Sequence, residues 1–72
     1  MAPDNADARL NRLAAWRARR AGEANLAPSD VVRNDQLERI AHEGPRSLEA
    51  LARILEPAQL ERYGTEVLAA LR

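Results

Sequence analysis

The side chains that could carry chemistry in this chain are one histidine, several carboxylates and a group of arginines near the start. His42 is the only histidine and cysteine is absent, so neither a zinc site nor a disulfide is predicted. The sequence has no glycine-rich phosphate loop, and no serine beside a candidate base. A lone histidine at a helix C-terminus is typically a surface residue that offsets the helix dipole. We therefore expect a non-catalytic protein that needs no cofactor and no metal.

The arginines between residues 9 and 20 are the strongest candidates for binding, because they share about three turns of one predicted helix. Arg9, Arg12 and Arg19 form one stripe of this helix. Arg17 and Arg20 form a second stripe, closer to the core. Two interpretations are open. Either these arginines form ion pairs with an acidic remainder of the domain, or they contact phosphates with an affinity that falls steeply with salt.

Charge is unevenly distributed along a chain that is neutral overall, with eleven arginines, no lysine and eleven acidic residues. Residues 1–22 contain five arginines and two aspartates, whereas residues 23–72 contain six arginines and nine acidic residues. A basic helix on an acidic remainder is predicted, and the zero sum gives no overall attraction to nucleic acid. Two ion pairs at helical spacing are expected on solvated faces, Asp35 with Arg39 and Glu49 with Arg53.

The elements that must position these residues are predicted to be helices, because no segment alternates apolar and polar residues as a strand would. An alanine-rich first helix is expected over about residues 5–21, capped by Asp4 or Asn5 and ended by Gly22. Residues 22–30 are rich in turn-forming residue types and therefore predict a loop.

The stretch VVRNDQLERIA, residues 31–41, is predicted to be the centre of the core, because a valine pair leads into an amphipathic helix. A single 3₁₀ turn at residues 28–31 is expected to precede it, with Leu26 turned inward. Asn34 or Asp35 is expected to cap the helix, and Gly44-Pro45 to end it. Its buried face repeats through Leu37, Ile40 and Ala41.

The C-terminal half is predicted to add three more helices. Ser47 is expected to cap one that ends near Glu56, with inward positions at Leu48, Leu51, Ala52 and Leu55. A short helix, PAQLER, should follow until Tyr63-Gly64 interrupt it, and TEVLAALR should form the last. The sequence therefore predicts an all-α fold, a compact bundle of about five short helices, with Trp16 and Tyr63 packed inside.

One small domain over residues 8–72 is expected, after a flexible N-terminal segment at residues 1–7. The sequence has no apolar run of the ~18 residues that a membrane span needs, and its first ten residues lack the apolar core of a signal peptide. These features predict an intracellular domain with no membrane partner.

Four stretches, taken in order, carry a resemblance to a known family: RLNRLAAWRARRA, PSDVVRNDQLERIA, GPRSLEALARI and PAQLERYGTEVLAAL. Their most specific pieces are Trp16-Arg17, VVRNDQL at residues 31–37 and LERYG at residues 60–64. Together they span about residues 8–71 and resemble an HRDC domain, the accessory module near the C-terminus of RecQ-type DNA helicases and RNase D. The resemblance implies a small all-helical bundle that assists nucleic-acid binding, while ATP hydrolysis or nuclease chemistry lies in other domains of the parent protein.

The sequence departs from the family pattern at two places. DNA-binding relatives often have an aromatic residue directly before the paired valines, where a base can stack, and this chain has Asp30 there. A carboxylate removes that stacking surface and repels phosphate. The segment Leu55-Glu56-Pro57 also lacks the glycines that relatives commonly have before the next helix, so close approach of main-chain amides to phosphate is not expected.

Two functions of different class follow from the resemblance. The first is an auxiliary, regulatory module of a bacterial RecQ-type helicase that weakly binds single-stranded or branched DNA, with the candidate residues Arg17, Arg20, Arg33 and Arg46. The second is a protein-interaction or intramolecular regulatory domain that docks on the rest of its parent or on another protein. An RNase D-type parent is a further alternative. A monomeric domain in the cytoplasm, associated with the nucleoid, is expected for the first.

Overall fold

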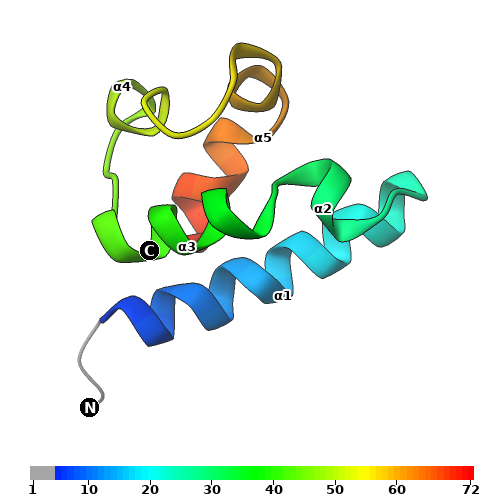
Figure 1. Cartoon of the computed structure of the whole chain (residues 1–72), viewed down its shortest axis with the longest axis horizontal. Coiled ribbons are helices and arrows are strands. Elements are labelled where there is room, and N and C mark those ends of the chain that lie inside the picture. The colour runs from blue at the N-terminus through cyan, green and yellow to red at the C-terminus, as the bar shows by residue number, and fades with distance from the viewer. Residues whose placement is uncertain (1–4) are drawn as a thin grey trace.

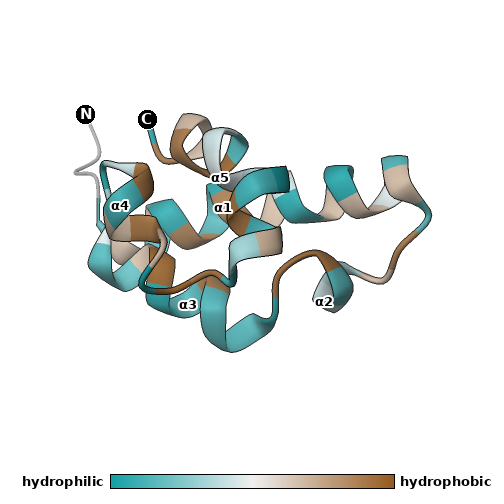
Figure 2. Ribbon diagram, turned by 90° about the horizontal axis from the view of Figure 1, so that it is seen from above, coloured by the Kyte–Doolittle hydropathy of each residue, from teal (hydrophilic) through white to brown (hydrophobic). Residues whose placement is uncertain are grey.

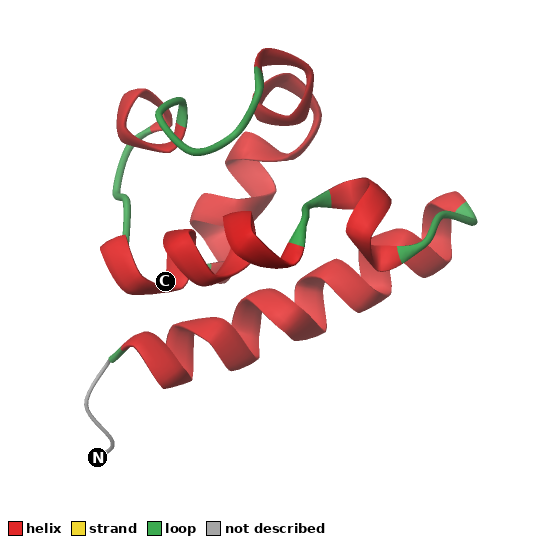
Figure 3. Cartoon of the chain, viewed as in Figure 1, coloured by secondary structure: helices red, strands yellow, loops and turns green. Residues whose placement is uncertain are grey.

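The chain folds into helices joined by short connections (Figure 1), in a computed structural model that describes residues 5–72. Along the chain these are α1 (Ala6–Ala24), α2 (Pro28–Val31), α3 (Asn34–Glu43), α4 (Leu48–Leu51) and α5 (Pro57–Ala70). No strand occurs within residues 5–72 (Figure 3), so the predicted all-α bundle is confirmed. Within the same residues no helix is both long enough and apolar enough to cross a membrane.

The long helix α1 forms the base on which α2, α3 and α5 pack. Figure 1 shows α2 and α3 returning along α1 in the opposite direction. α5 packs against α1 from another side, and the short α4 packs against α5. The N-terminal half of α1 therefore lies near the ends of both α3 and α5, whereas its C-terminal half lies beside α2.

The core lies where α1, α3 and α5 meet and contains the valine pair of the α2–α3 connection, which Figure 2 shows in the hydrophobic colour. Val31 and Val32 are fully buried, as predicted. Trp16 and Tyr63 are also buried, as predicted, and their rings meet edge to face with centroids 5.9 Å apart. The other buried apolar residues are Leu13, Ala21, Leu37, Ile40, Ala41, Leu51, Ile54, Leu55 and Val67.

The end of α1 differs from the prediction. Asn5 caps the start as expected, because its Oδ1 accepts a hydrogen bond from the Ala8 amide. The helix does not end at Gly22, however, but continues to Ala24, and Asn25 takes the left-handed conformation at φ 56°. Glycine costs only about 1 kcal/mol inside a helix, so an alanine-rich helix can run through it. Leu26 is 41% exposed, so its predicted inward position is wrong.

The starts of α3 and α5 are each held by a glutamine, which in α3 takes the place of the predicted cap. Arg33, not Asn34 or Asp35, is the N-cap of α3, and the Gln36 Oε1 accepts a hydrogen bond from the Arg33 amide at 3.0 Å. Gln59 does the same for the N-cap of α5 at 2.9 Å. The two glutamine amides also bond each other, at 2.8 and 2.9 Å. This pair joins the N-termini of the two helices. Gly44 ends α3 with φ 59°, as predicted.

The C-terminal half contains one long helix where two were predicted. Ser47 caps α4 as expected, but α4 is a single turn and does not reach Glu56. Leu48 is 44% exposed, so it does not face the core as predicted. α5 runs unbroken through Tyr63 and Gly64. Gly64 is buried against α4, because a Cβ added there would lie 2.8 Å from the Leu48 Cδ2, so this glycine permits close helix packing instead of interrupting the helix.

Candidate nucleic-acid interface

Arg17, the first candidate, belongs to α1, and its half-buried side chain reaches the α2–α3 connection. Its guanidinium donates a hydrogen bond to the Val32 carbonyl at 2.9 Å. A buried carbonyl at the end of a short helix needs such a partner, since water cannot reach it. Arg17 therefore holds the segment with the two valines against α1. Neither interpretation of this stripe included a main-chain carbonyl as the partner.

Arg20 belongs to an aromatic cluster between α1 and α5. Its guanidinium lies 3.2 Å from a Glu66 carboxylate oxygen and 5.4 Å from the centre of the Tyr63 ring. The Trp16 indole N–H donates a hydrogen bond to the same carboxylate at 3.1 Å. Arg20 therefore forms the kind of ion pair with the acidic remainder that one interpretation predicted. The Trp16–Glu66 contact joins positions fifty residues apart and has no sequence signature.

Arg33 lies at the start of α3, next to the carbonyl that Arg17 binds. We call this part of the surface the α2–α3 edge, and Arg33 is more exposed there than Arg17. Its guanidinium contacts the Asp35 carboxylate at 3.1 Å and the Glu56 carboxylate at 3.8 Å, while 53% of its side chain is exposed. The hydrogen bond from Arg33 lowers the pKa of Asp35 below its ordinary value of 3.8. The predicted pair of Asp35 with Arg39 is wrong, because Arg39 instead binds Glu43, one turn further along α3, at 2.6 Å.

Asp30 occupies the exposed outer side of α2, directly before the buried valine pair. No aromatic residue is exposed within residues 5–72, since both Trp16 and Tyr63 are buried. The described surface thus offers no ring on which a base could stack. Any contact with nucleic acid at this edge must rest on guanidinium groups.

Arg46 lies apart from the other candidates, beyond the C-terminus of α3, whereas Arg33 lies at its N-terminus. Ten helical residues separate these two ends, a length of about 15 Å. Arg46 is exposed and forms no hydrogen bond or ion pair with any residue in the range 5–72. The structure therefore brings Arg17 and Arg33 together at the α2–α3 connection, places Arg20 one turn further along α1, and leaves Arg46 elsewhere.

Two of the three arginines in the first stripe of α1, Arg9 and Arg12, also bond to main-chain carbonyls. Arg9 Nε donates to the Ala41 carbonyl at 2.6 Å, at the C-terminus of α3. Arg12 donates to the carbonyls of Ala70 and Leu71, both at 3.0 Å, at the C-terminus of α5. These carbonyls belong to the last turns of their helices, where no intrahelical donor remains. Arg9 and Arg12 of α1 therefore cap the C-termini of α3 and α5, respectively.

Residues 6–71 match the family model for the HRDC domain. Comparison with curated proteins and with solved structures gave no match. The family match extends from the first residue of α1 to the residue after α5 and so includes every helix of the structure. The chain accordingly belongs to the HRDC family and is a non-catalytic, auxiliary, nucleic-acid-associated module.

Proposed function

We propose that this HRDC domain is an auxiliary DNA-binding and regulatory module of a RecQ-type helicase, and that it contacts DNA weakly at the α2–α3 connection. The observation that carries the proposal is Arg33, which lies beside Arg17 on this edge and remains half-exposed within its ion pairs. Exposed ion pairs contribute only about 0–1 kcal/mol, so a phosphate can replace the carboxylates at little cost. The planar guanidinium suits phosphate oxygens.

The same geometry limits the affinity. Arg17 and Arg20 each already hold a partner inside the domain. Asp30 and Asp35 place carboxylates on both sides of Arg33 along the chain. We therefore expect this module to adjust how its parent enzyme chooses a DNA structure, not to hold DNA by itself.

Fluorescence anisotropy with labelled single-stranded and forked DNA, at low and moderate salt, tests this proposal. We expect weak binding at low salt, in the range of about 10⁻⁵–10⁻⁴ M, that is lost as salt increases. Arg33→Gln should weaken it and reduce the salt slope by about one. Arg19→Gln on α1 is the matched control, because Arg19 is exposed and lies beside Ala69 and Ala70 at the C-terminal end of α5, away from this edge.

A gain-of-function variant completes the experiment. Asp30→Tyr removes a carboxylate and supplies a ring on an exposed position, so single-strand affinity should increase by about tenfold. No binding of any DNA at low salt would overturn the proposal and favour the second role, docking on the rest of the parent protein or on another protein. Equal effects of Arg33→Gln and Arg19→Gln would show that DNA does not use this edge.

A further inference from the structure

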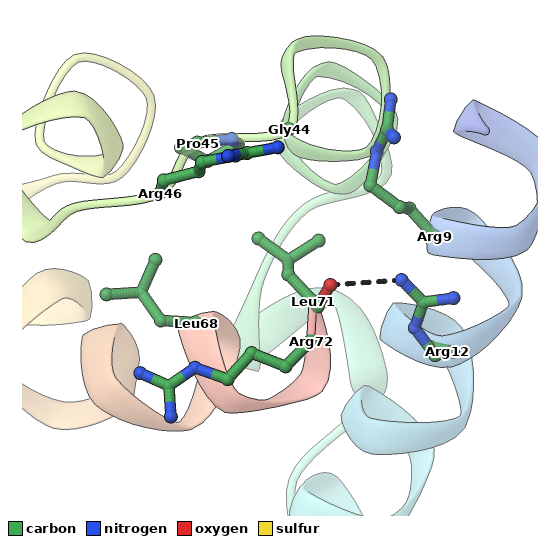
Figure 4. A pocket seen from close by; sticks show the side chains of 8 residues that line it. All are labelled: Arg9, Arg12, Gly44, Pro45, Arg46, Leu68, Leu71 and Arg72. Carbon is green, nitrogen blue, oxygen red and sulfur yellow. Dashed lines mark hydrogen bonds between the residues drawn. The ribbon is translucent and has the colours of Figure 1, made fainter. Parts of the chain in front are cut away.

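A second basic feature lies at the other end of α3, around a pocket of about 600 Å³ (Figure 4). Three parts of the chain form it: the first half of α1, the α3–α4 connection and the C-terminus of α5. We call it the arginine pocket. Its lining residues are Arg9, Arg12, Gly44, Pro45, Arg46, Leu68, Leu71 and Arg72. This volume falls within the usual range for ligand pockets, about 300–1,000 Å³.

The lining of the arginine pocket is strongly cationic. Four of its eight residues are arginine and none is acidic, whereas the seven arginines elsewhere in the chain are outnumbered by eleven acidic residues. The bonds of Arg9 and Arg12 to helix-end carbonyls hold both guanidiniums in place.

Arg46 and Arg72 are the accessible cations of this pocket. Both are exposed, and neither side chain has a hydrogen-bond or ion-pair partner within residues 5–72. Figure 4 shows Leu68 and Leu71 between these two arginines. An anionic group can therefore approach either arginine without displacing an existing carboxylate, unlike at Arg33.

The floor of the arginine pocket is apolar. Leu68 and Leu71 are half-buried and pack against the core from its outer side, and Pro45 is buried beside them. A ligand that fits must therefore combine negative charge with an apolar group. A peptide side chain suits this apolar floor better than the polar sugar-phosphate backbone of nucleic acid, and no aromatic side chain lines the pocket on which a base could stack instead.

We propose that the arginine pocket docks an acidic peptide segment of a partner protein, with carboxylates on Arg46 and Arg72 and one apolar side chain against Leu68 and Leu71. Charge complementarity to a pocket without acidic residues selects the carboxylates, and burial of the apolar side chain supplies the remaining affinity. This site is separate from the edge proposed for DNA. The two proposals therefore succeed or fail independently.

The test uses a short fluorescein-labelled peptide in which aspartates flank one central phenylalanine, measured by anisotropy against the full chain. We expect binding in the range of tens of micromolar that weakens with salt. Arg46→Glu should weaken it about tenfold, because it reverses a contacting charge. Arg62→Glu, the same reversal on an exposed residue outside the pocket, should leave it unchanged. Arg33→Gln, which tests the DNA edge, should also leave it unchanged.

Three further measurements decide the outcome. The peptide with alanine in place of phenylalanine should bind several-fold more weakly, and the intact peptide should shift the NMR signals of Leu68 and Leu71. No binding at low salt, equal effects of Arg46→Glu and Arg62→Glu, or equal affinity of the alanine peptide would overturn the proposal. So would displacement of the peptide by single-stranded DNA with shifts at the same leucines, since this would make nucleic acid the occupant.

Discussion

Single arginines in this domain differ in their partners, and the partner decides what each can do. Arg17 donates to a carbonyl at the core, Arg33 holds exposed carboxylates, and Arg46 contacts neither kind of group within residues 5–72. A guanidinium on a buried carbonyl cannot leave without exposing an unsatisfied acceptor. A guanidinium in exposed ion pairs can exchange its carboxylate partners with little loss of stability. Arg33 and Arg46 are therefore the accessible binding candidates, for two different sites.

The contact of Arg33 with Asp35 predicts a measurable titration shift. The hydrogen bond from Arg33 lowers the pKa of Asp35 below 3.8. Because the folded-state pKa is the lower one, this contact stabilises the fold above pH 3.8, and the stabilisation is lost as the pH falls through the folded-state pKa. In an NMR titration, Arg33→Gln should return the pKa of Asp35 toward 3.8. An Asp35 pKa that is the same in both proteins would contradict the contact.

At the scale of elements, the glycines show that a residue type alone does not fix a helix end. Gly22 is exposed inside α1, and a Cβ added to it would have nothing within 4 Å. Gly44 has φ +59°, and a Cβ there would lie 3.3 Å from the Arg9 guanidinium. The same substitution should therefore have opposite effects at these two positions.

Gly22→Ala should increase the free energy of unfolding by about 0.5–1 kcal/mol, because alanine loses less backbone entropy in a helix. Gly44→Ala should decrease it by about 1–2 kcal/mol, because an L-residue is strained in the left-handed conformation. Urea denaturation of both variants measures these changes. Destabilisation by Gly22→Ala would instead fit a helix that ends at residue 22.

At the scale of the whole molecule, arginines of α1 tie the chain together. Arg9, Arg12 and Arg17 reach, in turn, the C-terminus of α3, the C-terminus of α5 and the connection after α2. A domain of this size buries only about 60% of the surface of its unfolded chain, so polar contacts over long sequence separations matter more than in a larger protein. This chain has no disulfide to take that role, since it has no cysteine.

Arg12 allows a test of this role. It bonds two consecutive carbonyls through two different nitrogens, Nε and Nη2, each at 3.0 Å. Lysine keeps the charge but lacks this planar pair of donors. Arg12→Lys should therefore lower the free energy of unfolding by about 1 kcal/mol or more, close to the effect of Arg12→Ala. If Arg12→Lys were as stable as the wild type in urea, charge alone would explain the contact.

Most buried positions, and with them the fold class, were predictable from the sequence, although Leu26 and Leu48 are exposed against expectation. The valine pair, the face of α3 and the burial of Trp16 follow from apolar spacing, since local periodicity decides which side of a helix leaves water. Tyr63 is buried as expected, but within the unbroken α5 and not at a junction between two helices. The caps at Asn5, Gly44 and Ser47 were predictable for the same reason, because each depends on residues within one turn. Arg46 could be named as a candidate, but nothing near it in the sequence indicated a pocket.

Tertiary structure alone decided the partners of the polar side chains. The bond of Arg12 to Ala70 joins residues fifty-eight positions apart, and that of Gln36 to Gln59 joins residues twenty-three apart. The close approach of Leu48 to Gly64 of α5 is also a contact that no local pattern encodes. The arginine pocket likewise forms only where α1, the α3–α4 connection and the end of α5 meet. Apolar burial follows from local pattern, whereas a hydrogen bond depends on which distant group the packed helices bring within reach.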